Sequence, residues 1–210
     1  MANRRVFHFV ERGRGKLNRQ SPLANFDPAK LAYYEKENYV AYYQRDWLKL
    51  LRVSVGMVKE GFSLSLWQAI NAASLVARAE IAFAPFPNND VPRAKAIMRD
   101  FYRYINRVHH LNLDVARAAD VDVNWWIVHR KLFANPQNQE LVEALKNYYA
   151  LAYNAQPELL SQAAQHRALG MLYSDQWVNA GKPMPSELLV KEEEELRAGY
   201  IALRAALDSG

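Results

Sequence analysis

Cysteine is absent from the 210 residues. The protein therefore has no disulfide, no thiolate ligand for zinc or an iron–sulfur cluster, and no cysteine nucleophile. Eight glycines and nine prolines are too few for a fibrous or low-complexity protein. With half of the residues apolar and 23% charged, the composition is typical of a soluble globular domain, and the lack of cysteine favours a cytoplasmic location.

Long apolar runs are also lacking. The most apolar stretch, residues 64–86, is interrupted by two side-chain amides and by Arg78 and Glu80, which excludes it as a membrane-spanning helix. The first 20 residues contain only a five-residue apolar patch, broken by Glu11 and Arg12. We therefore expect neither a membrane span nor a secretory signal.

The sequence motifs that identify common enzyme classes are missing as well. There is no glycine-rich dinucleotide or phosphate loop, no HExxH zinc motif, no EF-hand loop and no GxSxG elbow. None of the five histidines follows a glutamate by three residues, so the ExxH pairs of ferritin-like di-iron bundles do not occur either. Most common enzyme classes are unlikely on these grounds, and no family resemblance is evident.

Positive charge is concentrated at the N-terminus. Residues 1–26 hold six basic residues and one acidic residue, so they carry the whole formal net charge of +5. Gly13, Gly15 and Pro22 make this segment a poor helix. We predict a basic extended arm over residues 1–26 that docks on the body or on a second copy, with nucleic-acid binding as an alternative.

Residues 27–210 are predicted to form one all-α domain, a bundle of six or seven helices. The Asp27–Pro28 pair is typical of a helix start, with a capping side chain followed by proline in the first turn. Asp90 is expected to cap the next helix, and the segment from Arg93 to Ala134 lacks glycine and proline, so it predicts one very long helix or two joined by a kink near residues 112–114. The other predicted boundaries come from capping residues, glycines and prolines: 27–58, 63–84, 135–153, 156–180 and 186–207.

Ionisable residues recur on faces that the bundle should bury. Asp122 and His129 share the apolar stripe of Trp126 at helical spacing. Three other predicted helices, over 27–58, 63–84 and 156–180, each add at least one such group. The candidate set is Glu37, Glu80, Asp122, Trp126, His129, Arg167 and Asp175.

A buried charge is costly unless it is paired or bound to a metal, so we expect these groups to meet. One reading is an internal salt-bridge network in which Arg167 neutralises one or more of the carboxylates. The other is a polar cavity that binds a small ligand or a metal ion, since carboxylates and histidine in a bundle core build metal sites.

An aromatic cluster and an acidic run have simpler interpretations. Tyrosines and a tryptophan surround the first predicted helix between Tyr33 and Trp47, and because they point in all directions they indicate self-association. The acidic run Glu192–Glu195 is typical of a solvated helix face near a helix N-terminus.

Together these features predict a self-associating helical-bundle protein that binds a small ligand or metal ion in a cavity between helices. A metal-dependent oxidase or hydrolase that uses the same carboxylates and histidine is the alternative enzyme hypothesis. An adaptor that binds nucleic acid through the basic arm is the third.

Overall fold

The computed structural model describes residues 21–85 and 87–209, and this part of the chain contains eight α-helices and no strand. The predicted all-α class is therefore confirmed. The helices are α1 (Pro28–Gln44), α2 (Trp47–Gly61), α3 (Leu66–Phe83), α4 (Val91–His109), α5 (Val115–Lys131), α6 (Gln139–Tyr153), α7 (Ser161–Asn179) and α8 (Glu187–Ser209), with short 3-10 turns η1 (Pro22–Ala24) and η2 (Pro157–Leu160).

Local capping begins several of these helices where the sequence predicts it. The Asp27 carboxylate accepts hydrogen bonds from the backbone N–H groups of Ala29 and Lys30 at 2.9 and 3.2 Å. Asp90 caps α4 in the same way. The predicted kink near residues 112–114 is a complete break, because His110 adopts a left-handed conformation after α4 and Asp114 caps α5.

The first predicted helix, over 27–58, is wrong as a single element. The chain turns at Arg45, which has φ of 61°, and Asp46 then caps α2 with a hydrogen bond to the N–H of Lys49. No glycine or proline marks this turn, so the boundary was missed. The split also explains why the described chain has eight helices, one more than the upper predicted number.

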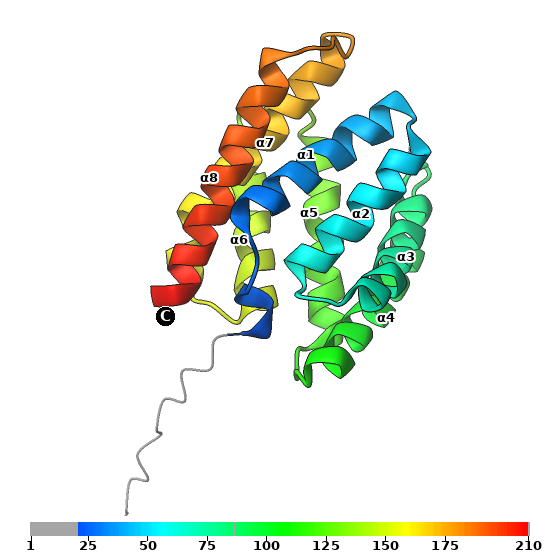
Figure 1. Cartoon of the computed structure of the whole chain (residues 1–210), viewed down its shortest axis with the longest axis vertical. Coiled ribbons are helices and arrows are strands. Elements are labelled where there is room, and N and C mark those ends of the chain that lie inside the picture. The colour runs from blue at the N-terminus through cyan, green and yellow to red at the C-terminus, as the bar shows by residue number, and fades with distance from the viewer. Residues whose placement is uncertain (1–20, 86, 210) are drawn as a thin grey trace, which may run out of the picture.

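The helices surround a common centre (Figure 1). The hairpin of α7 and α8 forms one side, α2, α3 and α4 form the other, and α1 runs between them in contact with α8 and α2. Close approach of α7 and α8 depends on small residues, since a Cβ at Gly199 would lie 3.1 Å from the carbonyl oxygen of Ala163. α5 and α6 complete the enclosure.

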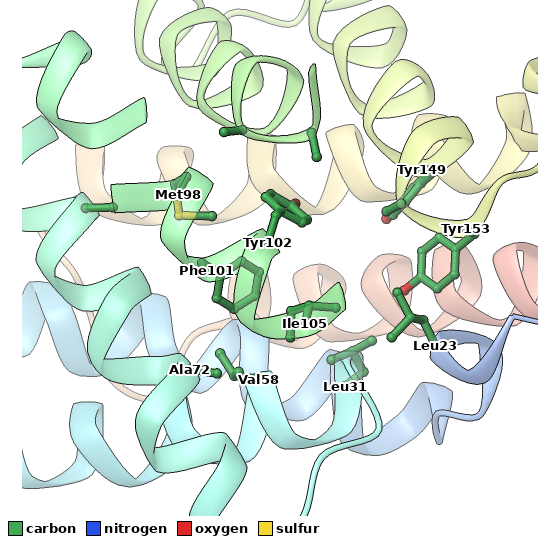
Figure 2. Packing of buried hydrophobic residues seen from close by; sticks show 14 of the residues in the cluster. Leu23, Leu31, Val58, Ala72, Met98, Phe101, Tyr102, Ile105, Tyr149 and Tyr153 are labelled. Carbon is green, nitrogen blue, oxygen red and sulfur yellow. The ribbon is translucent and has the colours of Figure 1, made fainter. Parts of the chain in front are cut away.

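The main apolar cluster includes residues from all eight described helices and from the start of the described chain. Figure 2 shows the part of it around α4 and α6. Phe101 and Tyr102 of α4 are almost fully buried, as are Leu23 and Phe26. Residues 21–26 of the predicted arm therefore belong to the packed body. The remaining arm, residues 1–20, lies outside the described residues.

No helix in the described part of the chain is both long enough and apolar enough to cross a membrane.

Candidate functional site

The three residues predicted to share one stripe of α5 do face the same interior space. Asp122 and Trp126 are buried, at 6% and 9% exposure, and His129 is half-buried. All three line a cavity at the centre of the bundle. The helical spacing of this stripe was therefore sufficient to place them.

The cavity has a volume of about 260 Å³, and each of the eight described helices contributes to its wall. Much of the wall is aromatic, including Trp125, Trp126, Tyr148, Tyr149, Tyr153 and Tyr200. The ionisable groups other than tyrosine are Glu35, Glu80, Asp122, His129, Arg167 and Glu192. Four carboxylic acids thus share the cavity wall with one arginine and one histidine.

Arg167 of α7 is held by an ion pair across the bundle. Its Nε donates to Glu35 Oε1 of α1 at 2.9 Å, and the hydroxyl of Tyr200 donates to the other Glu35 oxygen. The guanidinium also lies over the ring of Trp125, 4.9 Å from its centroid. Burial alone would lower the pKa of Arg167, but the charge of Glu35 and nearby tyrosines keep that pKa well above its ordinary value.

The expected partners of Arg167 were Glu37, Glu80, Asp122 and Asp175. The ion pair is instead made with Glu35, so the internal network exists with a different carboxylate.

Asp122 is satisfied by neutral donors. Its Oδ2 accepts from the hydroxyl of Tyr102 at 2.7 Å, and its Oδ1 accepts from Nε1 of Trp125 at 2.9 Å. Burial raises the pKa of Asp122 to about 6, although these hydrogen bonds act in the opposite direction. The two hydrogen bonds hold the Asp122 side chain in place in the cavity wall, and its carboxyl group gains or loses a proton near pH 6.

Glu80 of α3 has no hydrogen bond or ion pair with any residue that the structure describes. Its side chain is exposed by surface area, and it forms part of the cavity wall. Burial, with the neighbouring Asp122 carboxylate, raises the pKa of Glu80 to about 7. Of the predicted residues, Glu80 is the carboxylate most free to contact a ligand.

Glu192 of α8 contradicts the reading of the acidic run as a fully solvated face. It is 2% exposed, and its Oε2 has no hydrogen-bond partner within the described chain. Burial raises the pKa of Glu192 well above its ordinary value, and the charge of Glu35 adds to this effect. A buried carboxyl group in this setting is favoured in the protonated form.

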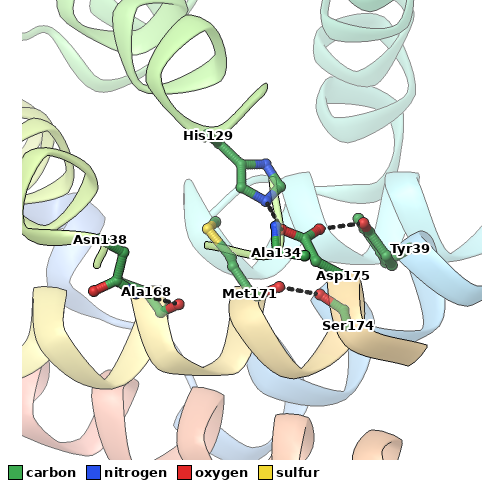
Figure 3. Close-up of polar contacts among 8 residues, drawn as sticks. All are labelled: Tyr39, His129, Ala134, Asn138, Ala168, Met171, Ser174 and Asp175. Carbon is green, nitrogen blue, oxygen red and sulfur yellow. Dashed lines mark hydrogen bonds and ion pairs between the residues drawn. The ribbon is translucent and has the colours of Figure 1, made fainter. Parts of the chain in front are cut away.

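Asp175 of α7 belongs to a separate, fully bonded junction (Figure 3). It accepts from the hydroxyl of Tyr39 at 2.6 Å and from the backbone N–H of Ala134 at 2.9 Å, and it lies 3.2 Å from Nε2 of His129. Ala134 has a positive φ of 56°, so Asp175 holds a turn that alanine rarely adopts. Asp175 is 2% exposed and does not line the central cavity.

Glu37 is not part of the site. It lies on another side of α1, where it forms ion pairs with Lys36, at 2.8 Å, and with Lys49. The phase assigned to the first helix was wrong, because it was extended through the turn at Arg45. A single helix over residues 27–58 would place Leu51 on the same face as Glu37, but Leu51 is 64% exposed.

The sequence reasoning missed Glu35, Glu192 and the tyrosines of α6 and α8. A signal for Glu35 was present, since it follows the buried Leu31 by four residues and so shares its face. Glu192 likewise precedes the buried Leu196 by four residues. Both were hidden because charged residues on the adjoining positions suggested solvated faces.

Among the described residues, no group of three or more histidines, aspartates and glutamates is close enough to hold a metal ion. The carboxylates around the cavity are instead spread over α1, α3, α5 and α8.

Comparison of the chain with protein-family models, with curated proteins and with solved structures finds no significant match.

Proposed function

We propose that the protein binds a small organic molecule in the central cavity. The observation that carries this proposal is a space of about 260 Å³ walled by every helix of the described chain. Interiors of proteins are normally packed with few voids larger than a water molecule. We therefore infer that a space of this size holds a bound molecule. Drug-sized ligands occupy pockets of about 300–1,000 Å³, so the ligand proposed here is smaller.

The wall chemistry supports binding of an organic molecule. Aromatic rings provide apolar area, and a few polar groups such as Glu80 and His129 provide direction, which is the usual composition of a ligand pocket. An apolar cavity of about 150 Å³ is enough to bind benzene in an engineered protein. The present cavity is therefore large enough for a two-ring compound.

Indole is a suitable neutral probe, because it is compact and aromatic. We expect indole to bind the full-length protein with a measurable heat in titration calorimetry and to raise the melting temperature. Val76→Phe places a ring on the cavity wall and should abolish binding. Val190→Phe makes the same substitution at a residue of α8 that is 59% exposed, and it should leave binding unchanged.

Equal binding of indole by the wild type and a folded Val76→Phe variant would contradict the proposal, because the probe would then bind elsewhere. Failure of indole and of the charged probes described below to bind at all would also contradict it.

Self-association is a second proposal. It is supported by large apolar side chains that stay exposed on α2 and α3, two helices that pack against each other. Leu48, Trp67 and Ile81 are 84%, 76% and 71% exposed. Sedimentation of the full chain should show concentration-dependent assembly that Trp67→Glu weakens. A monomer at all concentrations would contradict it.

The enzyme and nucleic-acid alternatives have less support. The metal-dependent enzyme hypothesis needs a ligand cluster, and none is present among the described residues. Nucleic-acid binding was assigned to the basic arm, whose first 20 residues lie outside the described chain. Binding to heparin across a salt series tests it, since phosphate-type contacts weaken steeply with salt.

A further inference from the structure

The cavity wall contains two carboxylic acids for which the described chain supplies no partner. Glu80 makes no hydrogen bond or ion pair with any described residue, and Oε2 of Glu192 is buried and unbonded. Buried polar groups are nearly always hydrogen-bonded in proteins. Two such groups lack a partner in the described chain, Oε2 of Glu192 and the hydroxyl of Tyr149, and both residues line the cavity. They indicate that a group from outside the chain completes the site.

Among the described residues, Arg167 is the only arginine or lysine that lines the cavity, and it already forms an ion pair. Arg167 is paired with Glu35 and lies under the rings of Trp125, Tyr148 and Tyr149. No other lysine or arginine of the described chain lines the cavity. Because Glu35 is paired with Arg167 and Glu192 is favoured as the neutral acid, Glu80 and Asp122 are the carboxylates on the wall that no cation neutralises. When ionised, they favour a positively charged occupant and disfavour an anion.

The surroundings of Glu80 add a flat apolar contact. Phe83, three residues further along α3, packs edge-on against Trp126 with ring centroids 5.7 Å apart. Trp126 and Val76 line the cavity together with Glu80. A carboxylate and an indole ring that line one cavity can bind an amine together, because the carboxylate accepts a charge-assisted hydrogen bond from the ammonium group and the ring contacts the apolar part of the ligand.

We propose that the ligand of the central cavity is a small aromatic or flat apolar amine, whose ammonium group is bound by Glu80 and whose apolar body packs against Trp126. This inference rests on the proposed function, since it names the chemical class that the same cavity takes.

Three probes that share one ring system separate charge from shape. Tryptamine carries an ammonium group, indole is neutral, and indoleacetate carries a carboxylate. Titration calorimetry on the full-length protein at pH 7.5, above the pKa of about 7 that burial gives Glu80, should rank the affinities as tryptamine above indole above indoleacetate. We expect tryptamine to bind roughly tenfold or more tightly than indole, the gain of one charge-assisted hydrogen bond.

Substitutions at Glu80 assign the preference to one side chain. Glu80→Gln should reduce the tryptamine affinity to about that of indole. Glu80→Asp keeps the charge and should keep the preference for tryptamine. Glu140→Gln is the matched control, because Glu140 of α6 pairs with Lys131 on the surface and does not line the cavity.

Binding of indoleacetate as tight as that of tryptamine would overturn this inference, as would an unchanged tryptamine affinity in Glu80→Gln. So would a larger rise in melting temperature with magnesium or zinc chloride than with tryptamine, since the occupant would then be a metal ion. In these cases indole can still bind, and the proposed function stands. Absence of binding by all three indole probes would remove both.

Discussion

Replacement of Arg167 by methionine should strongly destabilise the fold. Methionine keeps a long apolar side chain but removes the guanidinium that pairs with Glu35 at 2.9 Å. The side chains of Arg167 and Glu35 are 10% and 14% exposed, so the carboxylate would be left inside the bundle. No other lysine or arginine of the described chain lines the cavity, so no cation on the cavity wall replaces the lost charge.

The magnitude follows from these contacts. Removing one partner of a buried ion pair costs about 3–5 kcal/mol, and loss of the cation over Trp125, 4.9 Å from its ring centroid, adds about 0.5–2 kcal/mol. Packing of methionine against the same rings offsets part of this cost. We expect the free energy of unfolding to fall by about 3–4 kcal/mol.

Urea denaturation followed by circular dichroism at pH 7 measures this loss. Arg103→Met is the matched control, because Arg103 pairs with Asp100 on the surface and both side chains are 59% exposed. The control should cost at most about 1 kcal/mol. Glu35→Gln combined with Arg167→Met should recover part of the loss, since it removes the stranded charge.

A loss for Arg167→Met that equals the loss for Arg103→Met would refute this reasoning. It would mean that Arg167 and Glu35 are solvated and that the central pair contributes no more than a surface salt bridge.

Two further predictions concern the buried acid of α5 and the start of the chain. Because the folded pKa of Asp122 is about 6, above its ordinary 3.8, the stability that it contributes is complete below about pH 4 and lost as the pH rises through 6. The free energy of unfolding of the wild type, measured by urea denaturation, should therefore fall by up to about 3 kcal/mol relative to that of Asp122→Asn between pH 4 and 7. If the two proteins show the same dependence of this free energy on pH, the prediction is contradicted. Deletion of residues 1–20 should leave the melting temperature nearly unchanged, whereas deletion of residues 1–26 also removes the buried Leu23 and Phe26 and should cost at least about 3 kcal/mol. Equal melting temperatures of the two truncated proteins would show that these side chains add nothing to the fold.

The sequence by itself determined most helix starts and the all-α class. Asp27, Asp90 and Asp114 cap helices through hydrogen bonds to N–H groups two or three residues away. Such interactions need no distant partner, so they can be recognised from neighbouring residues alone. The break between α4 and α5 was predicted within a few residues for the same reason.

Periodicity also placed part of the site. Asp122, Trp126 and His129 lie within one uninterrupted helix, where spacing fixes which residues share a face. The same argument failed for Glu37, because the turn at Arg45 resets the direction of the inner face and no glycine or proline announces it.

Only the tertiary structure decided which charges meet. Arg167 pairs with Glu35 across 132 residues of sequence, and this contact depends on how α1 and α7 are rotated and packed. A sequence pattern can show that a charge faces inward, but it carries no information about the distance between two such faces. The unpaired state of Glu80 and the burial of Glu192 likewise exist only because eight helices pack around a space that their side chains do not fill.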